Sequence, residues 1–87
     1  MALYRVERQM PTVGDEEIDA AAFRAVTCLA LFPDVRWVRS YFDHKTYHFT
    51  CYYEAKDSED IRKHAQVARI PCDAIAEVAE FLPEMYQ

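Results

Sequence analysis

With 87 residues the chain has the length of one domain, and we expect a single domain over 1–87. Its 52% of hydrophobic residues and 14% of aromatic residues exclude a disordered tail. Ten basic residues against fifteen acidic ones give a net charge of −5, which argues against nucleic acid as a partner because phosphates attract basic surfaces.

The first third of the chain predicts a strand and then a helix. Residues 2–10 alternate between apolar and polar side chains, as a half-buried strand does. Gly14 is expected to cap a helix whose first turn is acidic, which suits the positive end of the helix dipole. Apolar residues at helical spacing between 18 and 32 predict its buried stripe, and Pro33 ends it.

The rest of the chain predicts a hairpin, a second helix and a last strand. Residues 35–42 and 47–54 are rich in aromatic and β-branched residues and are separated by a short polar turn. Asp57 is expected to cap the second helix, which ends before Pro71. Residues 74–82 suit either a helix or a strand, and we predict a strand because it completes a symmetric unit.

This order of elements, βαββαβ, predicts an α+β, ferredoxin-like sandwich. Such a domain has a four-stranded antiparallel sheet with both helices on one face. The other face is left open. A short chain with so many aromatic residues is expected to cover that face with a second copy, as a homodimer.

The hairpin predicts which side chains lie on the open face. A turn centred on residues 44 and 45 pairs Tyr41 with His48, Arg39 with Thr50 and Trp37 with Tyr52. By alternation the open face then carries Arg5, Glu7, Trp37, Arg39, Tyr41, His48, Thr50, Tyr52 and Glu54. The opposite set, from Val38 and Ser40 to Cys51 and Tyr53, is expected to pack under the helices.

Two interpretations of the open face remain. Six of its residues are candidates for a pocket or an interface: Glu7, Trp37, Arg39, Tyr41, His48 and Tyr52. In one interpretation Glu7 and Arg39 form an ion pair within a dimer interface that the aromatic residues fill. In the other, polar groups converge in a small pocket with aromatic walls, between the sheet and the partner.

The three histidines, His44, His48 and His64, are the candidate metal ligands, with help from carboxylates. No HxH or HExxH spacing occurs, which argues against a preformed catalytic zinc site. Cys51 is the best-placed thiol, but its position in the strand directs it toward the core, where a cysteine is inert. A single glycine in the chain excludes a glycine-rich phosphate loop, so no nucleotide cofactor is expected.

Cysteine usage and hydropathy bear on the compartment. Cys28, Cys51 and Cys72 are odd in number and form no CxxC pair, which argues against a disulfide scaffold. The charged N-terminus lacks the apolar segment of a signal peptide, and no apolar run is long enough to span a bilayer. We therefore expect a cytoplasmic protein with no membrane partner.

Several short motifs together resemble a known family. They are VER at 6–8 and the proline after it, WVRSY at 37–41, CYYEA at 51–55, IRKHA at 61–65, and IPCDAIAEV at 70–78. In this order and spacing they resemble a family of small bacterial proteins of unknown function that includes a nickel-binding protein. The resemblance implies a ferredoxin-like fold, a homodimer and divalent-metal binding at the dimer surface. Gly14, Asp15 and Lys56 depart from the family's usual residues.

Three functions are compatible with these observations. The first is a small dimeric protein that binds a divalent metal, nickel by the resemblance, in sequestration or homeostasis. The second is a cofactor-free enzyme with its pocket between the open sheet face and the partner, in which Glu7 with His48 or Tyr52 transfers a proton. The third is an accessory binding domain with no catalytic role. The first requires imidazoles and carboxylates within coordination reach of one another.

Overall fold

The computed structural model describes all residues, 1–87, and contains the six predicted elements in the predicted order. They are β1 (Ala2–Gln9), α1 (Asp15–Cys28), β2 (Arg36–Asp43), β3 (His48–Ala55), α2 (Ser58–Ala68) and β4 (Ala74–Val78). Short 3₁₀ turns follow α1 at Leu29–Leu31 and close the chain at Pro83–Tyr86.

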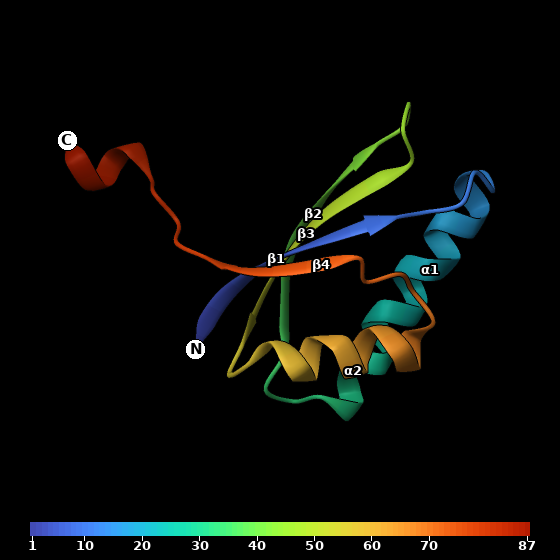
Figure 1. Ribbon diagram of the computed structural model, residues 1–87, viewed down its shortest axis with the longest axis horizontal. Coiled ribbons are helices and arrows are strands. Elements are labelled where there is room, and N and C mark those ends of the chain that lie inside the picture. The colour runs from blue at the N-terminus through green and yellow to red at the C-terminus, as the bar shows by residue number, and fades with distance from the viewer.

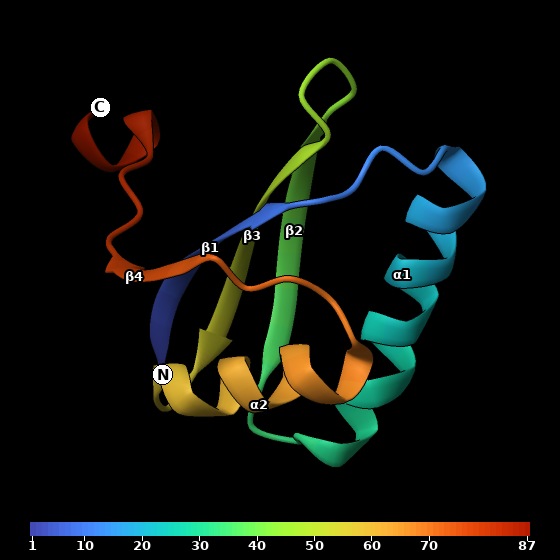
Figure 2. The ribbon, with the colours of Figure 1, turned by 45° about the vertical axis from the view of Figure 1, so that its right-hand side comes forward.

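The four strands form one antiparallel sheet in the order β2-β3-β1-β4. Both helices lie on the same side of this sheet (Figures 1 and 2). The predicted ferredoxin-like α+β fold is therefore confirmed. Neither helix combines the length and the apolar character that a membrane crossing requires.

The core lies between the sheet and the helices. Its largest fully buried side chains are Val6 of β1, Tyr53 of β3, and Ile61 and His64 of α2. Tyr4 and Val6 face the helices, so the alternation predicted for the first strand is correct. The same alternation buries Arg8, of which 3% is exposed.

The hairpin differs from its predicted register in two ways. Tyr41 lies opposite Thr50 rather than His48, a shift of two residues. A shift by two keeps each side chain on its face, so Arg39 and Tyr41 stay on the open side. A β-bulge between Trp37 and Arg39 then reverses the alternation, because it adds one residue to β2.

Trp37 is consequently on the helix side of the sheet, and the prediction that it lies on the open face is wrong. It pairs with Tyr53 across the strands and stacks on it with ring centroids 6.3 Å apart. Its indole Nε1 donates a hydrogen bond of 2.8 Å to Ser40 Oγ. Val38, predicted to face the helices, instead lines a hollow on the open face.

The last strand is shorter than predicted. β4 is a strand, as expected, but it ends at Val78 rather than at residue 82. Residues 79–87, which we call the C-terminal arm, lead away from the sandwich (Figure 2). Phe81, Leu82, Met85 and Tyr86 in this arm are exposed.

Asp57 caps α2 as predicted, which yields a first test. Its carboxylate accepts a hydrogen bond of 3.1 Å from the backbone N–H of Asp60. We expect Asp57→Ala to lower the free energy of unfolding by about 1 kcal/mol in urea denaturation, because the backbone N–H of Asp60 in the first turn of α2 loses its acceptor. Asp57→Ser, which restores an acceptor, should recover most of the loss. Equal losses in both variants would contradict a capping role.

Candidate functional site on the open face of the sheet

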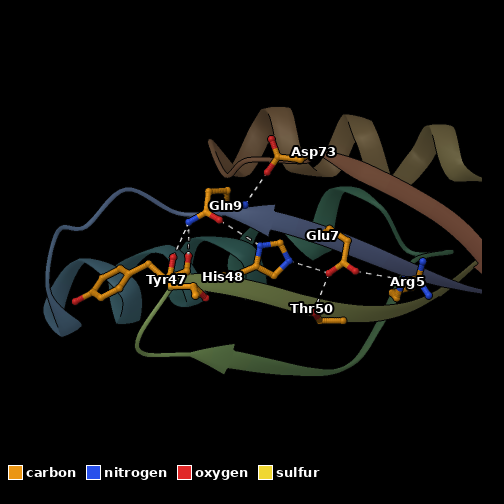
Figure 3. A network of polar contacts seen from close by, with 8 residues as sticks. Arg5, Glu7, Gln9, Tyr47, His48, Thr50 and Asp73 are labelled. Carbon is orange, nitrogen blue, oxygen red and sulfur yellow. Dashed lines mark hydrogen bonds and ion pairs between the residues drawn. The ribbon is translucent and has the colours of Figure 1, made fainter.

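Glu7 is the centre of a polar network on the open face (Figure 3). Glu7 of β1 and Thr50 of β3 are cross-strand partners, and His48 lies two residues before Thr50 on the same face. Thr50 Oγ1 donates a hydrogen bond of 2.8 Å to Glu7 Oε1. His48 Nε2 lies 3.0 Å from the same oxygen, and Arg5 Nε lies 3.3 Å from Oε2.

Gln9 orients the imidazole of His48 from the other side. The Gln9 amide nitrogen donates to the backbone carbonyl oxygens of Thr46, at 2.8 Å, and Tyr47, at 3.3 Å. These contacts turn the amide oxygen toward His48, where Oε1 lies 3.4 Å from Nδ1. Since this oxygen only accepts hydrogen bonds, Nδ1 carries a proton in this contact. The contact between Nε2 and the Glu7 carboxylate requires a proton on Nε2 as well, so the lone pair of Nε2 becomes available to a metal ion only when that proton leaves.

The network also fixes the ionisation of Glu7. Hydrogen bonds from His48 and Thr50, with the nearby charge of Arg5, hold the pKa of the Glu7 carboxyl below its ordinary value. Glu7 is therefore a carboxylate at neutral pH. An ionised carboxylate can bind a metal cation. It is a weaker candidate for a general base, which needs a pKa nearer neutrality. The side chains of Glu7 and His48 are 29% and 34% exposed, so solvent ions can reach them.

Three other candidate residues line a separate hollow on the same face. Arg39, Tyr41 and Tyr52 border a depression of about 430 Å³, which extends to the base of the C-terminal arm. The rings of Tyr41 and Tyr52 meet edge to face, with centroids 6.5 Å apart. Arg39 lies 3.8 Å from Glu80 of the arm. The ion pair between Glu7 and Arg39, which one of the two interpretations contained, is not formed within the chain, where Glu7 pairs with Arg5 and His48.

The three candidate metal histidines lie apart. His44 is exposed in the hairpin turn, with its ring 5.0 Å from that of Phe42. His64 is fully buried between α2 and the sheet, where its Nε2 lies 2.8 Å from the carbonyl oxygen of Ala25. No cluster of three or more His, Cys, Asp or Glu side chains is placed to hold a metal ion. Of the predicted ligands, only His48 lies beside a carboxylate on the open face, that of Glu7.

The sequence contained signals for two residues that we did not single out. Gln9 follows Arg5 and Glu7 at the strand period of two, which places it on the open face beside His48. Arg8 follows Tyr4 and Val6 at the same period, which places its guanidinium inside the sandwich. Charged residues are rarely fully buried, so an arginine at a core-facing position of the alternation is unusual and indicates a special environment for Arg8.

Comparisons with known proteins agree with the fold and give the family. The sequence profile of the family described as "nickel responsive protein SCO4226-like" matches residues 4–78. A comparison with curated proteins finds no match. Among solved structures, the crystal structure of SCO4226 from Streptomyces coelicolor A3(2) superposes with a TM-score of 0.78. It shares 17% sequence identity, and the match covers 93% of this chain and 100% of that one.

Proposed function

Because the chain belongs to the SCO4226-like family of nickel responsive proteins, we propose that it is a small homodimeric protein that binds divalent nickel, in sequestration or homeostasis. The observation that carries the proposal is the contact of 3.0 Å between His48 Nε2 and Glu7 Oε1 on the open face. Imidazole nitrogen and carboxylate oxygen are both donors that nickel accepts. A cytoplasmic location is part of the same proposal.

The surroundings of this pair suit a metal ligand. A ligating histidine usually donates its second ring N–H to an oxygen, which fixes the tautomer, and Gln9 Oε1 lies where that acceptor is required. The lowered pKa of Glu7 keeps its carboxylate charged, as a ligand must be. One chain offers two donors here, so water or a second copy would supply the others. The metal would be held by Glu7 of β1 and His48 of β3, and Gln9 would orient the imidazole of His48.

Nickel titration tests the proposal directly. In calorimetry at neutral pH we expect His48→Ala and Glu7→Gln each to weaken binding by about tenfold or more. Binding should also disappear at acid pH, because a ligating imidazole must be free of its proton. His44→Ala is the matched control, since it removes an imidazole that no carboxylate contacts, and it should leave the titration unchanged.

The Glu7→Gln variant also separates metal binding from an interface role. A dimer that stays intact and loses nickel supports the site, whereas a dimer that dissociates assigns Glu7 to the interface. Identical titrations for the wild type, His48→Ala and Glu7→Gln would remove this pair from the account of nickel binding.

A further inference from the structure

Arg8 is a buried cation without an acidic partner. Its side chain is enclosed between the sheet and the helices, with 3% exposed. One guanidinium nitrogen donates to the carbonyl oxygen of Pro71, and Nη2 donates to the Tyr53 hydroxyl at 3.1 Å. The guanidinium also lies over the Tyr53 ring, 5.6 Å from its centroid. None of the ion pairs in the structure includes Arg8. A buried charge of this kind is costly unless an opposite charge accompanies it.

A cavity adjoins this guanidinium. It lies between the sheet and α1 and has a volume of about 40 Å³. Its walls are mostly apolar, with Ala21, Ala22 and Ala25 on the helix side and Trp37 among the sheet residues. One water needs roughly 10–15 Å³ of such space, so the cavity has room for a molecule of a few heavy atoms.

The polar groups that line the cavity offer more hydrogen-bond donors than acceptors. Besides Arg8, the lining includes the hydroxyls of Ser40 and Tyr53 and the thiol of Cys51. Each hydroxyl oxygen already accepts a hydrogen bond, from Trp37 Nε1 and from Arg8 Nη2 respectively. Neither hydroxyl donates to a protein acceptor, so both protons are free. Burial raises the pKa of the Tyr53 phenol, which keeps its proton in place at neutral pH.

We propose that this cavity binds a small monocarboxylate of about two to three carbons. The carboxylate accepts hydrogen bonds from Arg8 and the two hydroxyls, and the short alkyl tail packs against the alanines of α1. Carboxylates suit this arrangement because a guanidinium binds them through parallel N–H donors, and more strongly inside the protein than in bulk water. The cavity lies on the opposite side of the sheet from Glu7 and His48, so it is independent of the proposed nickel site.

Trp37 provides the readout, because it is the one tryptophan of the chain and lines the cavity. The full-length protein is titrated with sodium acetate at constant ionic strength, and the indole N–H resonance and the fluorescence are followed. We expect a saturable change with acetate. Acetamide, which has the same shape without the charge, and sodium chloride should give none. Arg8→Met should weaken acetate binding by about tenfold or more, since it removes the charge-assisted hydrogen bonds.

Two further variants keep the test decisive. Arg62→Met makes the same change at an exposed arginine of α2 and should bind acetate as the wild type does. Ala22→Ile keeps the Arg8 charge but fills the cavity, so it should abolish the response even if Arg8→Met fails to fold. No saturable change with acetate, an equal response to acetamide, or undiminished binding in Ala22→Ile would each overturn the proposal.

Discussion

At micromolar concentration the chain should sediment at twice its mass of 10.2 kDa, and Phe81→Asp should reduce it to a monomer. Phe81 is 73% exposed and stacks on Tyr86 of the same arm, with ring centroids 6.1 Å apart. A charge at this position would have to be buried against the partner, which opposes association.

The position of the C-terminal arm is the reason to expect a second copy there. The arm projects beyond β4 (Figure 1). Its apolar side chains are exposed. Its base borders the open-face hollow, where Glu80 faces Arg39. Arm and open face thus form one continuous surface of aromatic and charged residues. A surface of this kind is typical of an interface between two copies of a small domain.

Phe23 offers a matched control for the assembly. It is 74% exposed on the outer side of α1, so Phe23→Asp makes the same change at the same exposure away from the sheet. We expect Phe23→Asp to remain a dimer in sedimentation velocity. A dimer that survives Phe81→Asp and dissociates in Phe23→Asp would move the interface to the helix layer. A monomeric wild type would contradict the dimer altogether.

The order of elements was predictable because the local signals agreed with one another. The alternation of β1, the acidic first turn of α1 and the cap at Asp57 each follow from short-range rules. β4 was ambiguous on its own, since alanine and glutamate also favour helices. Its strand conformation depends on pairing with β1, from Leu3 with Val78 to Glu7 with Ala74, which no local rule contains.

The site was only partly predictable, and β2 shows why. Strand alternation placed Arg39 and Tyr41 on the open side despite a register error, because a shift of two preserves the faces. No glycine or proline next to Trp37 indicates the bulge, so the sequence pattern could not predict that Trp37 lies on the opposite face from the one that simple alternation gives it. The hairpin register also decides which residue of β2 lies near Glu7: the error of two residues placed Arg39 opposite Thr50, the cross-strand partner of Glu7, where the structure has Tyr41.

The two faces of β1 therefore carry different chemistry at neighbouring positions. Glu7 presents a solvent-accessible carboxylate beside an imidazole on the open side. Arg8, the next residue, carries an enclosed positive charge toward the helices. One side thus suits a metal cation and the other a small anion, and a rigid strand keeps the two apart.

Stability should fall when the pH is lowered from 7 to 5, and His64 should be the cause. Burial, with the nearby charge of Arg8 as a further cause, lowers the pKa of the His64 imidazole below the ordinary 6.5. The folded state thus holds His64 neutral while the unfolded state takes up a proton. Its contribution is complete above pH 6.5 and is lost as the pH falls from there toward the folded-state pKa. The unfolding free energy should therefore decrease below pH 6.5, with a slope from this one group of at most about 1.4 kcal/mol per pH unit.

Urea denaturation at pH 7, 6 and 5, at one protein concentration, measures this slope. His64→Gln keeps a donor near the position of Nε2, toward the carbonyl of Ala25, but does not titrate, so its stability should be nearly flat across this range. His44→Ala removes an exposed histidine and should keep the wild-type slope. Glu7 does not affect this measurement. The stability that its lowered pKa contributes is lost only as the pH falls below the ordinary 4.5. If His64→Gln retained the acid sensitivity, the titrating group would have to be sought elsewhere, and His64 would be a packing residue alone.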